Sequence, residues 1–145
     1  MCGFCGSITP NKYSEEELKH TVSDMYKELL HRGPDDHGSW VDAEHGIALG
    51  HTRLSILDLS EHGSQPMQST NGRWVISYNG EIYNHLAIRK EINHLTKNRK
   101  WNGNCDTETL AEAISIWGIE KTLRKINGMF GFAAWDRQEK ILYIA

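Results

Sequence analysis

Cys2 is the residue of this chain best placed to act as a nucleophile, because it directly follows the initiator methionine. Removal of Met1 would leave a thiol and a free α-amine on the same residue. Unperturbed thiols and α-amines titrate near ~8.5 and ~8, so the amine can take the thiol proton without help from a histidine. The Met1-Cys2 pair therefore predicts an N-terminal nucleophile. A cysteine that merely happens to stand early in the chain would look the same.

Cys2 and Cys5 also form a Cys-x-x-Cys pair, a spacing found in zinc sites and redox pairs. A structural zinc site needs four ligands, and Cys105 is the last of the three cysteines. Histidines would have to complete the site, and none has ligand spacing beside a second cysteine pair. Zinc bound to Cys2 would also prevent its thiol from acting as a nucleophile. We expect no metal site, and a non-enzymatic metal- or thiol-binding module remains the alternative.

A second candidate group lies in residues 78–84, Tyr-Asn-Gly-Glu-Ile-Tyr-Asn. The preceding residues 73–78 predict a strand that ends at a turn formed by Asn79 and Gly80. The Asn79 side-chain amide and the Gly80 backbone amide can present two donors at one point, as an oxyanion hole requires. The turn and the site are compatible, because a sharp turn exposes such donors.

Arg53 and Asp106 together would define a pocket for an amino acid. An arginine can hold an α-carboxylate through two parallel hydrogen bonds, and an aspartate can accept a hydrogen bond from an α-ammonium. Each residue also has a purely structural interpretation. Arg53 could be a surface arginine, and Asp106 is a suitable N-cap for the helix predicted to follow it.

The elements that must position these residues are strands and helices in mixed order. Strands are predicted at 3–8, 37–42, 46–51, 73–78, 129–135 and 141–145. Ser14 and Glu17 form a capping box for a first helix, which should stop near Arg32. This order predicts an α+β fold with antiparallel sheets rather than strict βαβ alternation.

Residues 84–126 should contain two further helices and a short amphipathic segment. One helix should start near Asn84 and bury Ile88, Ile92 and Leu95, which share a helical stripe. Another should follow Asp106 and stop at Gly118. The short apolar piece over residues 119–126 should lead into the strand at 129–135.

Bulk properties exclude several classes of protein. The chain has 145 residues, 39% hydrophobic and 24% charged, with a formal net charge of -3. Such a charge gives no reason to expect nucleic acid or a membrane surface as a partner. No apolar run approaches the roughly 20 residues of a membrane span, and no signal peptide is evident. Few cysteines in an odd number favour a reducing compartment, so we expect a cytoplasmic protein.

Read together, these segments resemble the class II, N-terminal-nucleophile (Ntn) glutamine amidotransferase domain of asparagine synthetases. The similar blocks occur in the family's order along nearly the whole chain. They are MCGFCG at 1–6, HRGPDDHG at 31–38, LGHTRLSILDLS at 49–60, QPM at 65–67, YNGEIYNH at 78–85, CDTE at 105–108 and NGMFGFAAWD at 127–136. The resemblance implies the Ntn hydrolase fold, a four-layer αββα sandwich of antiparallel sheets.

The resemblance also implies a role for each matching residue. Cys2 matches the nucleophile that forms a glutamyl thioester and releases ammonia, while Asn79 and Gly80 match the oxyanion-hole pair. The residues that match the glutamine-binding groups are Arg53 for the carboxylate, Glu81 and Asp106 near the ammonium, and Leu54 and Ile56 in the pocket-forming segment. Arg32 lies in the HRGPD block, where we expect it to organise the loop.

In that family the ammonia passes to a C-terminal domain that activates aspartate with ATP and magnesium. Residues 1–145 contain no Gly-rich phosphate loop, so ATP and magnesium are expected only in that synthetase domain. We expect residues 1–145 to be a glutamine amidotransferase type-2 domain that is C-terminally incomplete, with the synthetase domain absent. The expected partners are L-glutamine and the ammonia-accepting domain, with a homodimer left open.

Two cysteines depart from the family's pattern. Cys5 stands where a small or apolar residue is more usual, and Cys105 stands where serine is usual. Both are nearly isosteric replacements that packing can explain, although they would also allow an inhibitory disulfide or a metal site near Cys2. The acceptor of the ammonia is a further open point, because a synthetase-like enzyme that modifies a sugar would have the same N-terminal motifs.

Overall fold

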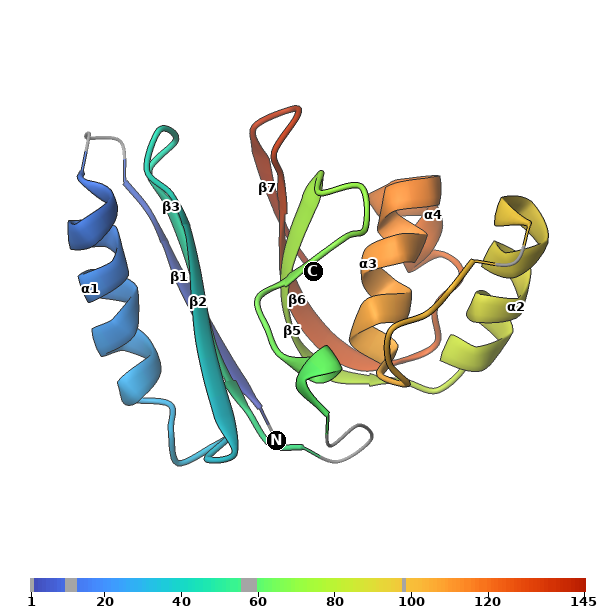
Figure 1. Cartoon of the computed structure of the whole chain (residues 1–145), viewed down its shortest axis with the longest axis horizontal. Helices are drawn as coiled ribbons and strands as arrows, with labels where there is room; N and C mark the ends of the chain where they lie inside the picture. Colours follow the sequence, from blue (N-terminus) through green and yellow to red (C-terminus); the bar gives the residue numbers. More distant parts are fainter. Residues whose placement is uncertain (1, 10–12, 56–59, 98) are drawn as a thin grey trace.

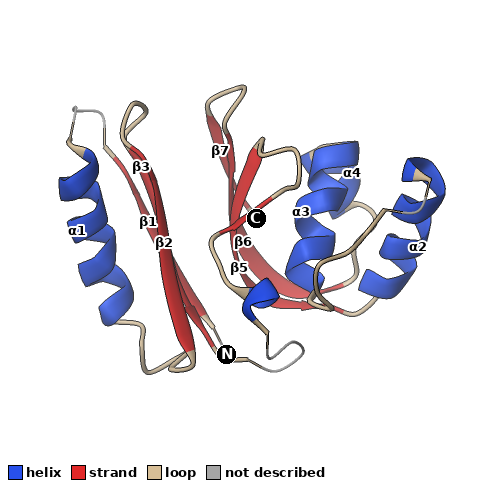
Figure 2. Cartoon of the chain, viewed as in Figure 1, coloured by secondary structure: helices blue, strands red, loops and turns tan. Residues whose placement is uncertain are grey.

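The computed structural model describes residues 2–9, 13–55, 60–97 and 99–145 of the chain (Figure 1). Two antiparallel sheets pack face to face, and helices cover both outer faces (Figure 2). The layers are α1, the first sheet, the second sheet and then α3 with α4, while α2 packs beyond α3. This arrangement confirms the predicted α+β fold with antiparallel sheets in an αββα sandwich.

The two sheets have three and four strands in the described part of the chain. The first sheet has the order β1 (Gly3–Ile8), β3 (Ile47–Arg53) and β2 (Asp36–Asp42). The second has the order β4 (Met67–Gln68), β5 (Trp74–Ile82), β6 (Gly128–Asp136) and β7 (Ile141–Ile144). The helices are α1 (Glu15–Lys27), η1 (Glu61–Gly63, a 3-10 turn), α2 (His85–Thr96), α3 (Asp106–Trp117) and α4 (Ile119–Leu123). None of the helices in this described part of the chain is both long and apolar enough to cross a membrane.

Helix α1 begins as predicted and ends earlier than predicted. The Ser14 side chain accepts from the Glu17 backbone, and the Glu17 carboxylate accepts from the Ser14 backbone N–H at 2.7 Å. The helix ends at Lys27 rather than near Arg32. Residues 28–33 instead form successive turns whose Leu29 carbonyl accepts from the Thr52 hydroxyl at 3.1 Å. This contact joins the segment that follows α1 to the first sheet.

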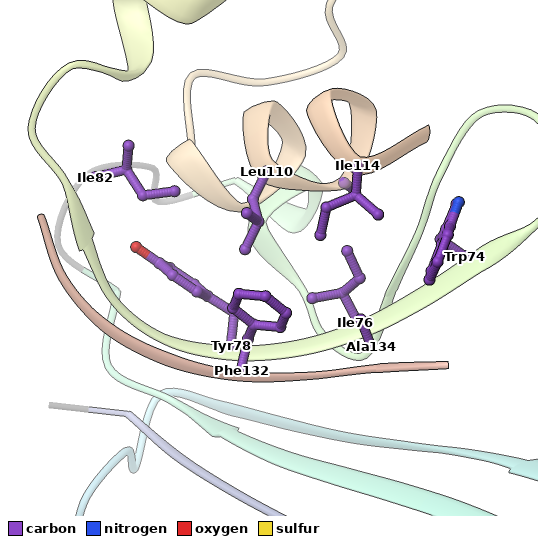
Figure 3. Close-up of a cluster of buried hydrophobic side chains, with 9 residues drawn as sticks. Trp74, Ile76, Tyr78, Ile82, Leu110, Ile114, Phe132 and Ala134 are labelled. Atoms are coloured by element: carbon purple, nitrogen blue, oxygen red, sulfur yellow. The ribbon is translucent and has the colours of Figure 1, made fainter. Parts of the chain in front are cut away.

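The hydrophobic core consists of separate apolar layers. Between the sheets, Leu49 and Val75 form a cluster with Ile47, Ala133 and Trp135. Between the second sheet and α3, the inward side chains of β5 and β6 pack against Leu110 and Ile114, as Figure 3 shows. The side chains labelled there are Trp74, Ile76, Tyr78, Ile82, Leu110, Ile114, Phe132 and Ala134.

Two other details of the predicted elements were wrong. Strand β5 does not end at a turn but continues through Asn79 and Gly80 to Ile82, because it pairs with β6 along its whole length. On α2, Ile88 and Ile92 are buried as expected, whereas Leu95 is 59% exposed. The apolar stripe of α2 therefore ends one turn before the helix does.

Candidate active site

A cavity of about 240 Å³ opens where Cys2, the end of β3, the middle of β5 and the start of α3 meet. It contains every residue singled out from the sequence as nucleophile, oxyanion donor or ligand group, except Ile56, which lies outside the described residues. Met1 also lies outside them. The lining residues are Cys2, Arg53, Leu54, Gly63, Tyr78, Asn79, Gly80, Glu81, Tyr83, Cys105, Asp106, Thr107 and Met129.

Cys2 immediately precedes β1, and the strand register places it beside the end of β3. Gly3 pairs with Thr52, so the next residues outward are Cys2 and Arg53. The Leu54 N–H donates to Cys2 Sγ at 3.3 Å, and the sulfur lies 3.7 Å from the Leu54 carbonyl. Arg32 Nε donates to the Cys2 carbonyl at 3.2 Å, in keeping with a loop-organising role. The half-buried thiol is thus held at the cavity wall with an N–H donor directed at it.

The other two cysteines occupy different environments. Cys5 packs under α1 with Leu18 and Val22, and this burial raises the pKa of its thiol. Cys105 is buried in the cavity wall, with its sulfur 3.7 Å from the His62 carbonyl. None of these three cysteines, all of which lie in the described part of the chain, is in a disulfide. Within the described part of the chain, no three His, Cys, Asp or Glu side chains converge as a metal site, so the Cys-x-x-Cys pair has no completed ligand set there.

Strand β5 presents one backbone edge to the cavity. Successive residues of an antiparallel strand direct their N–H and C=O groups to opposite edges. The N–H of Tyr83 bonds toward β6 and that of Ile82 does not, so even-numbered residues face away from β6. On this edge the Tyr78 N–H donates to Gln65 Oε1 at 2.7 Å. Gly80 stands between Tyr78 and Ile82 on the same edge, where the N–H of a cavity-lining residue can serve as a donor.

Gly80 is required by the close approach of β6. A β-carbon at this position would collide with the Met129 carbonyl and with Cα of Phe130. The pattern Asn-Gly therefore does not mark a turn here. It allows β5 and β6 to stay paired while the backbone lines the cavity.

Arg53 is almost fully buried, which excludes the interpretation as a surface arginine. Its Nη1 donates to the Ser60 carbonyl at 2.9 Å. The guanidinium packs on Gly63, where any side chain would collide with it. The end of β3 and the turn η1 thus hold a buried cation at the wall of the cavity.

Asp106 is the first residue of α3 rather than its N-cap, which is Cys105. One carboxylate oxygen, Oδ2, accepts from the Tyr78 hydroxyl at 2.6 Å and from the Ile82 N–H at 2.9 Å. Burial, followed by the neighbouring Asp106 charge, raises the pKa of Tyr78, so the phenol stays a hydrogen-bond donor. The carboxylate is fixed in orientation at 5% exposure while its residue lines the cavity.

Three residues that support the site were missed by the sequence analysis: His51, Gln65 and Tyr78. His51 is fully buried between the sheets, with Nε2 3.1 Å from the Tyr78 carbonyl. Burial lowers the pKa of His51 to about 4, so the ring is neutral at pH 7. All three residues lie inside the motif blocks named above, which is the sequence signal that could have pointed to them. Only the fold brings His51 and Gln65 to the edge of β5 at Tyr78.

The sequence profile described as "Glutamine amidotransferase domain" matches residues 1–145. The chain belongs to this family. The glutamine amidotransferase domain is enzymatic, and its members carry out glutamine-dependent amido transfer. The resemblance identified from the sequence motifs is thereby confirmed.

Curated relatives of this glutamine amidotransferase domain are longer proteins. "Asparagine synthetase [glutamine-hydrolyzing] 3" of Bacillus subtilis is 37% identical over 100% of this chain and 23% of its own length. "Asparagine synthetase [glutamine-hydrolyzing] 1" of the same organism is 34% identical over 99% of this chain and 22% of its own length. "Amidase chry2" of Gibberella zeae is 32% identical, covering 100% and 22%. The chain thus spans about a quarter of the length of these relatives.

The fold is shared with a solved amidotransferase. Glutamine phosphoribosylpyrophosphate amidotransferase of Bacillus subtilis superimposes with a TM-score of 0.68 at 16% identity, over 93% of this chain and 34% of that one. At this identity the likeness shows the fold alone, which is the predicted Ntn-type sandwich.

Proposed function

We propose that this glutamine amidotransferase domain releases ammonia from glutamine through a thioester on Cys2. The observation that carries the proposal is the convergence of four groups on one cavity: the Cys2 thiol, the Asn79-Gly80 edge, Arg53 and Asp106. A thiol, an oxyanion donor, a cation and a carboxylate are what recognition and cleavage of a free α-amino acid amide require. The cavity is also of a size suited to one small ligand.

Each group has a proposed role in binding. Arg53 holds the substrate α-carboxylate through its guanidinium. Asp106, with Glu81 near it, accepts hydrogen bonds from the α-ammonium. Leu54, with Ile56 in the same segment, shapes the pocket around the substrate. Together these contacts direct the side-chain amide of glutamine toward Cys2.

The proposed chemistry begins after removal of Met1. The α-amine of Cys2 takes the thiol proton, and the sulfur attacks the side-chain carbonyl carbon. Asn79 and Gly80 donate hydrogen bonds to the resulting oxyanion. Collapse breaks the C–N bond, the α-amine returns its proton to the leaving nitrogen, and ammonia departs. Water then hydrolyses the glutamyl thioester to glutamate and restores the thiol.

The acceptor of the ammonia is proposed from the relatives. Those of high similarity are asparagine synthetases, so we infer ATP-dependent asparagine formation from aspartate in a separate synthetase domain, in the cytoplasm. ATP and magnesium would bind to that domain. A sugar or another acceptor is the alternative, because the residues of this cavity bind glutamine and do not contact the acceptor.

Intact mass spectrometry before and after exposure to a glutamine-like diazoketone tests the proposal. We expect loss of Met1 and a single adduct on Cys2, suppressed by excess glutamine and absent in Cys2→Ser. Cys5→Ser is the matched control and should label normally, because Cys5 lies under α1. Retention of Met1, or an adduct confined to Cys5 or Cys105, would exclude the mechanism.

A further inference from the structure

On the edge that faces away from β6, strand β5 has no strand neighbour among the described residues along the part that lines the cavity. Its neighbour β4 has two residues, Met67 and Gln68, which pair with Ile76 and Val75. Beyond that point, no strand in the described part of the chain pairs with the backbone groups of Tyr78 on this edge. Buried backbone groups need partners, because an unpaired one costs about as much as a lost hydrogen bond.

Two side chains replace the missing strand at Tyr78. Gln65 Oε1 accepts from the Tyr78 N–H at 2.7 Å, and Gln65 Nε2 donates to the Thr107 hydroxyl at 3.3 Å. On the carbonyl side, His51 Nε2 lies 3.1 Å from the Tyr78 oxygen. A carbonyl oxygen can only accept, so Nε2 must carry the proton and donate it. This assigns the tautomer of the neutral His51 ring.

The Tyr78 carbonyl belongs to the same planar peptide unit as the Asn79 N–H. Fixing that carbonyl fixes the plane of the peptide that enters Asn79. The Asn79 backbone is held by β6 on the other edge, opposite Gly131. His51 therefore supplies the contact on the cavity side that fixes the peptide entering Asn79, the residue that carries one proposed oxyanion donor in its side chain and precedes the other, the Gly80 N–H.

His51 is not placed to touch a substrate. Its side chain is completely buried between the sheets, and it does not line the cavity. It stands on β3 two residues before Arg53, so it joins the strand that carries the buried cation to the strand that carries the oxyanion donors. The contact of His51 thus connects the end of β3 with the cavity-lining part of β5 from outside the cavity.

We propose that His51 is a positioning residue for the glutaminase reaction, holding the Tyr78–Asn79 peptide so that Asn79 and Gly80 aim their donors at the oxyanion. The inference rests on the proposed function. It predicts that loss of the His51 donor harms the transition state more than it harms glutamine binding, since the oxyanion exists only after attack.

Substitution at His51 separates this role from a structural one. His51→Leu removes the donor, and His51→Gln places an amide N–H near the position of Nε2. Loss of a direct oxyanion donor costs about 10²–10³ in kcat, so we expect His51→Leu to lower kcat about 10- to 100-fold with KM for glutamine changed less than about threefold. His51→Gln should restore kcat to within about fivefold of the wild type.

Controls keep this test distinct from that of the proposed function. Ammonia release by the wild-type chain and its Cys2 labelling are measured first, and their failure would reject the proposed function itself. Iodoacetamide alkylation of Cys2 needs no oxyanion hole and should proceed equally in both variants. Equal kcat in His51→Leu and the wild type would overturn the role of His51. The role would also be overturned if kcat fell equally in His51→Leu and His51→Gln and if that fall were matched by a rise in KM or by a loss of thermal stability.

A second measurement needs no variant to fold. Long-range ¹H–¹⁵N NMR spectra of the wild-type chain report which ring nitrogen of His51 is protonated. We expect the Nε2–H tautomer at neutral pH, unchanged when the cavity is occupied by the diazoketone adduct. An Nδ1–H tautomer would leave the Tyr78 carbonyl without its donor and would overturn the proposal.

Discussion

The two outer helices of the sandwich, α1 and α3, cover their sheets in different ways. Helix α1 buries two side chains, Leu18 and Val22, and otherwise faces solvent. Helix α3 is buried along Asp106–Ile114, including its polar residues. Its first residue contacts β5 through the Tyr78 hydroxyl and the Ile82 N–H. Helix α1 therefore only covers its sheet, whereas α3 both covers its sheet and lines the cavity.

The polar contacts of the two helices differ in the same way. In α1 the capping box and the ion pairs lie on the exposed surface. In α3 the carboxylates are paired inside the protein: Glu108 accepts from the N–H groups of Asn102 and Gly103 at 2.9 and 3.0 Å, and Glu112 from that of Thr70 at 2.7 Å. Buried paired carboxylates fix the loops around α3. We infer that changes on the α3 side reach the site and changes on the α1 side do not.

The largest expected effect comes from the same truncation made in both helices. Leu18→Ala and Leu110→Ala each remove a side chain that is at most 1% exposed. Each should lower the free energy of unfolding by about 2–5 kcal/mol. Leu110→Ala should also raise KM for glutamine about tenfold, because α3 carries Asp106, while Leu18→Ala should leave KM unchanged. Urea unfolding measures the stability of both variants, and ammonia release at a temperature well below the unfolding transition measures KM. Equal changes in KM would contradict the distinction.

A smaller effect is expected from the ion pair that joins β5 to β6. Arg73 donates to both carboxylate oxygens of Asp136, at 2.9 and 2.6 Å, and the Asp136 side chain is 1% exposed. Arg73→Met should lower the free energy of unfolding by about 2 kcal/mol at pH 7. The matched control, Arg137→Met, removes an exposed arginine nearby and should cost much less.

The loss in Arg73→Met should depend on pH. Burial of Asp136 opposes its ionisation, but hydrogen bonds from Arg73 and from two backbone N–H groups outweigh this and lower its pKa. Its contribution to stability is therefore complete above the unfolded value of about 3.9 and is lost as pH falls through the lower folded value. In unfolding curves of both proteins from pH 7 to pH 3, the difference in the free energy of unfolding should stay constant down to about pH 4 and shrink below it. A difference in the free energy of unfolding that did not change with pH would show that the contribution of the ion pair does not depend on the ionisation of Asp136.

The smallest effect is expected at the N-terminus of α1. Ser14→Ala removes the capping box and should destabilise the chain by about 1 kcal/mol. This corresponds to a drop of about 3 °C in Tm for a domain of this size. Glutamine kinetics should be unchanged, because α1 contacts the site only through the first sheet. A change in kcat without a change in stability would show that α1 influences the active site as well as covering the first sheet.

Local sequence signals predicted the parts of the fold that depend on near neighbours. The capping box at Ser14, the start of α2 after Asn84 and the stop of α3 at Gly118 were confirmed. Signals that depend on distant neighbours were misleading. Asn79 and Gly80 have turn propensity, but pairing with β6 keeps them in a strand. Leu95 fits a helical stripe, but its side chain is exposed at the end of α2.

The sequence by itself determined which chemical groups are present: a thiol at residue 2, an Asn-Gly donor pair, an arginine and an aspartate, each within a recognisable block. It could do so because residue type and spacing carry this information directly. Only the tertiary structure decided that Cys2 faces the cavity while Cys5 lies under α1. It likewise decided that His51 and Gln65 complete the edge of β5. The reason is physical: strand register and sheet packing set which face and which edge a residue occupies, and these come from contacts between segments far apart in the chain.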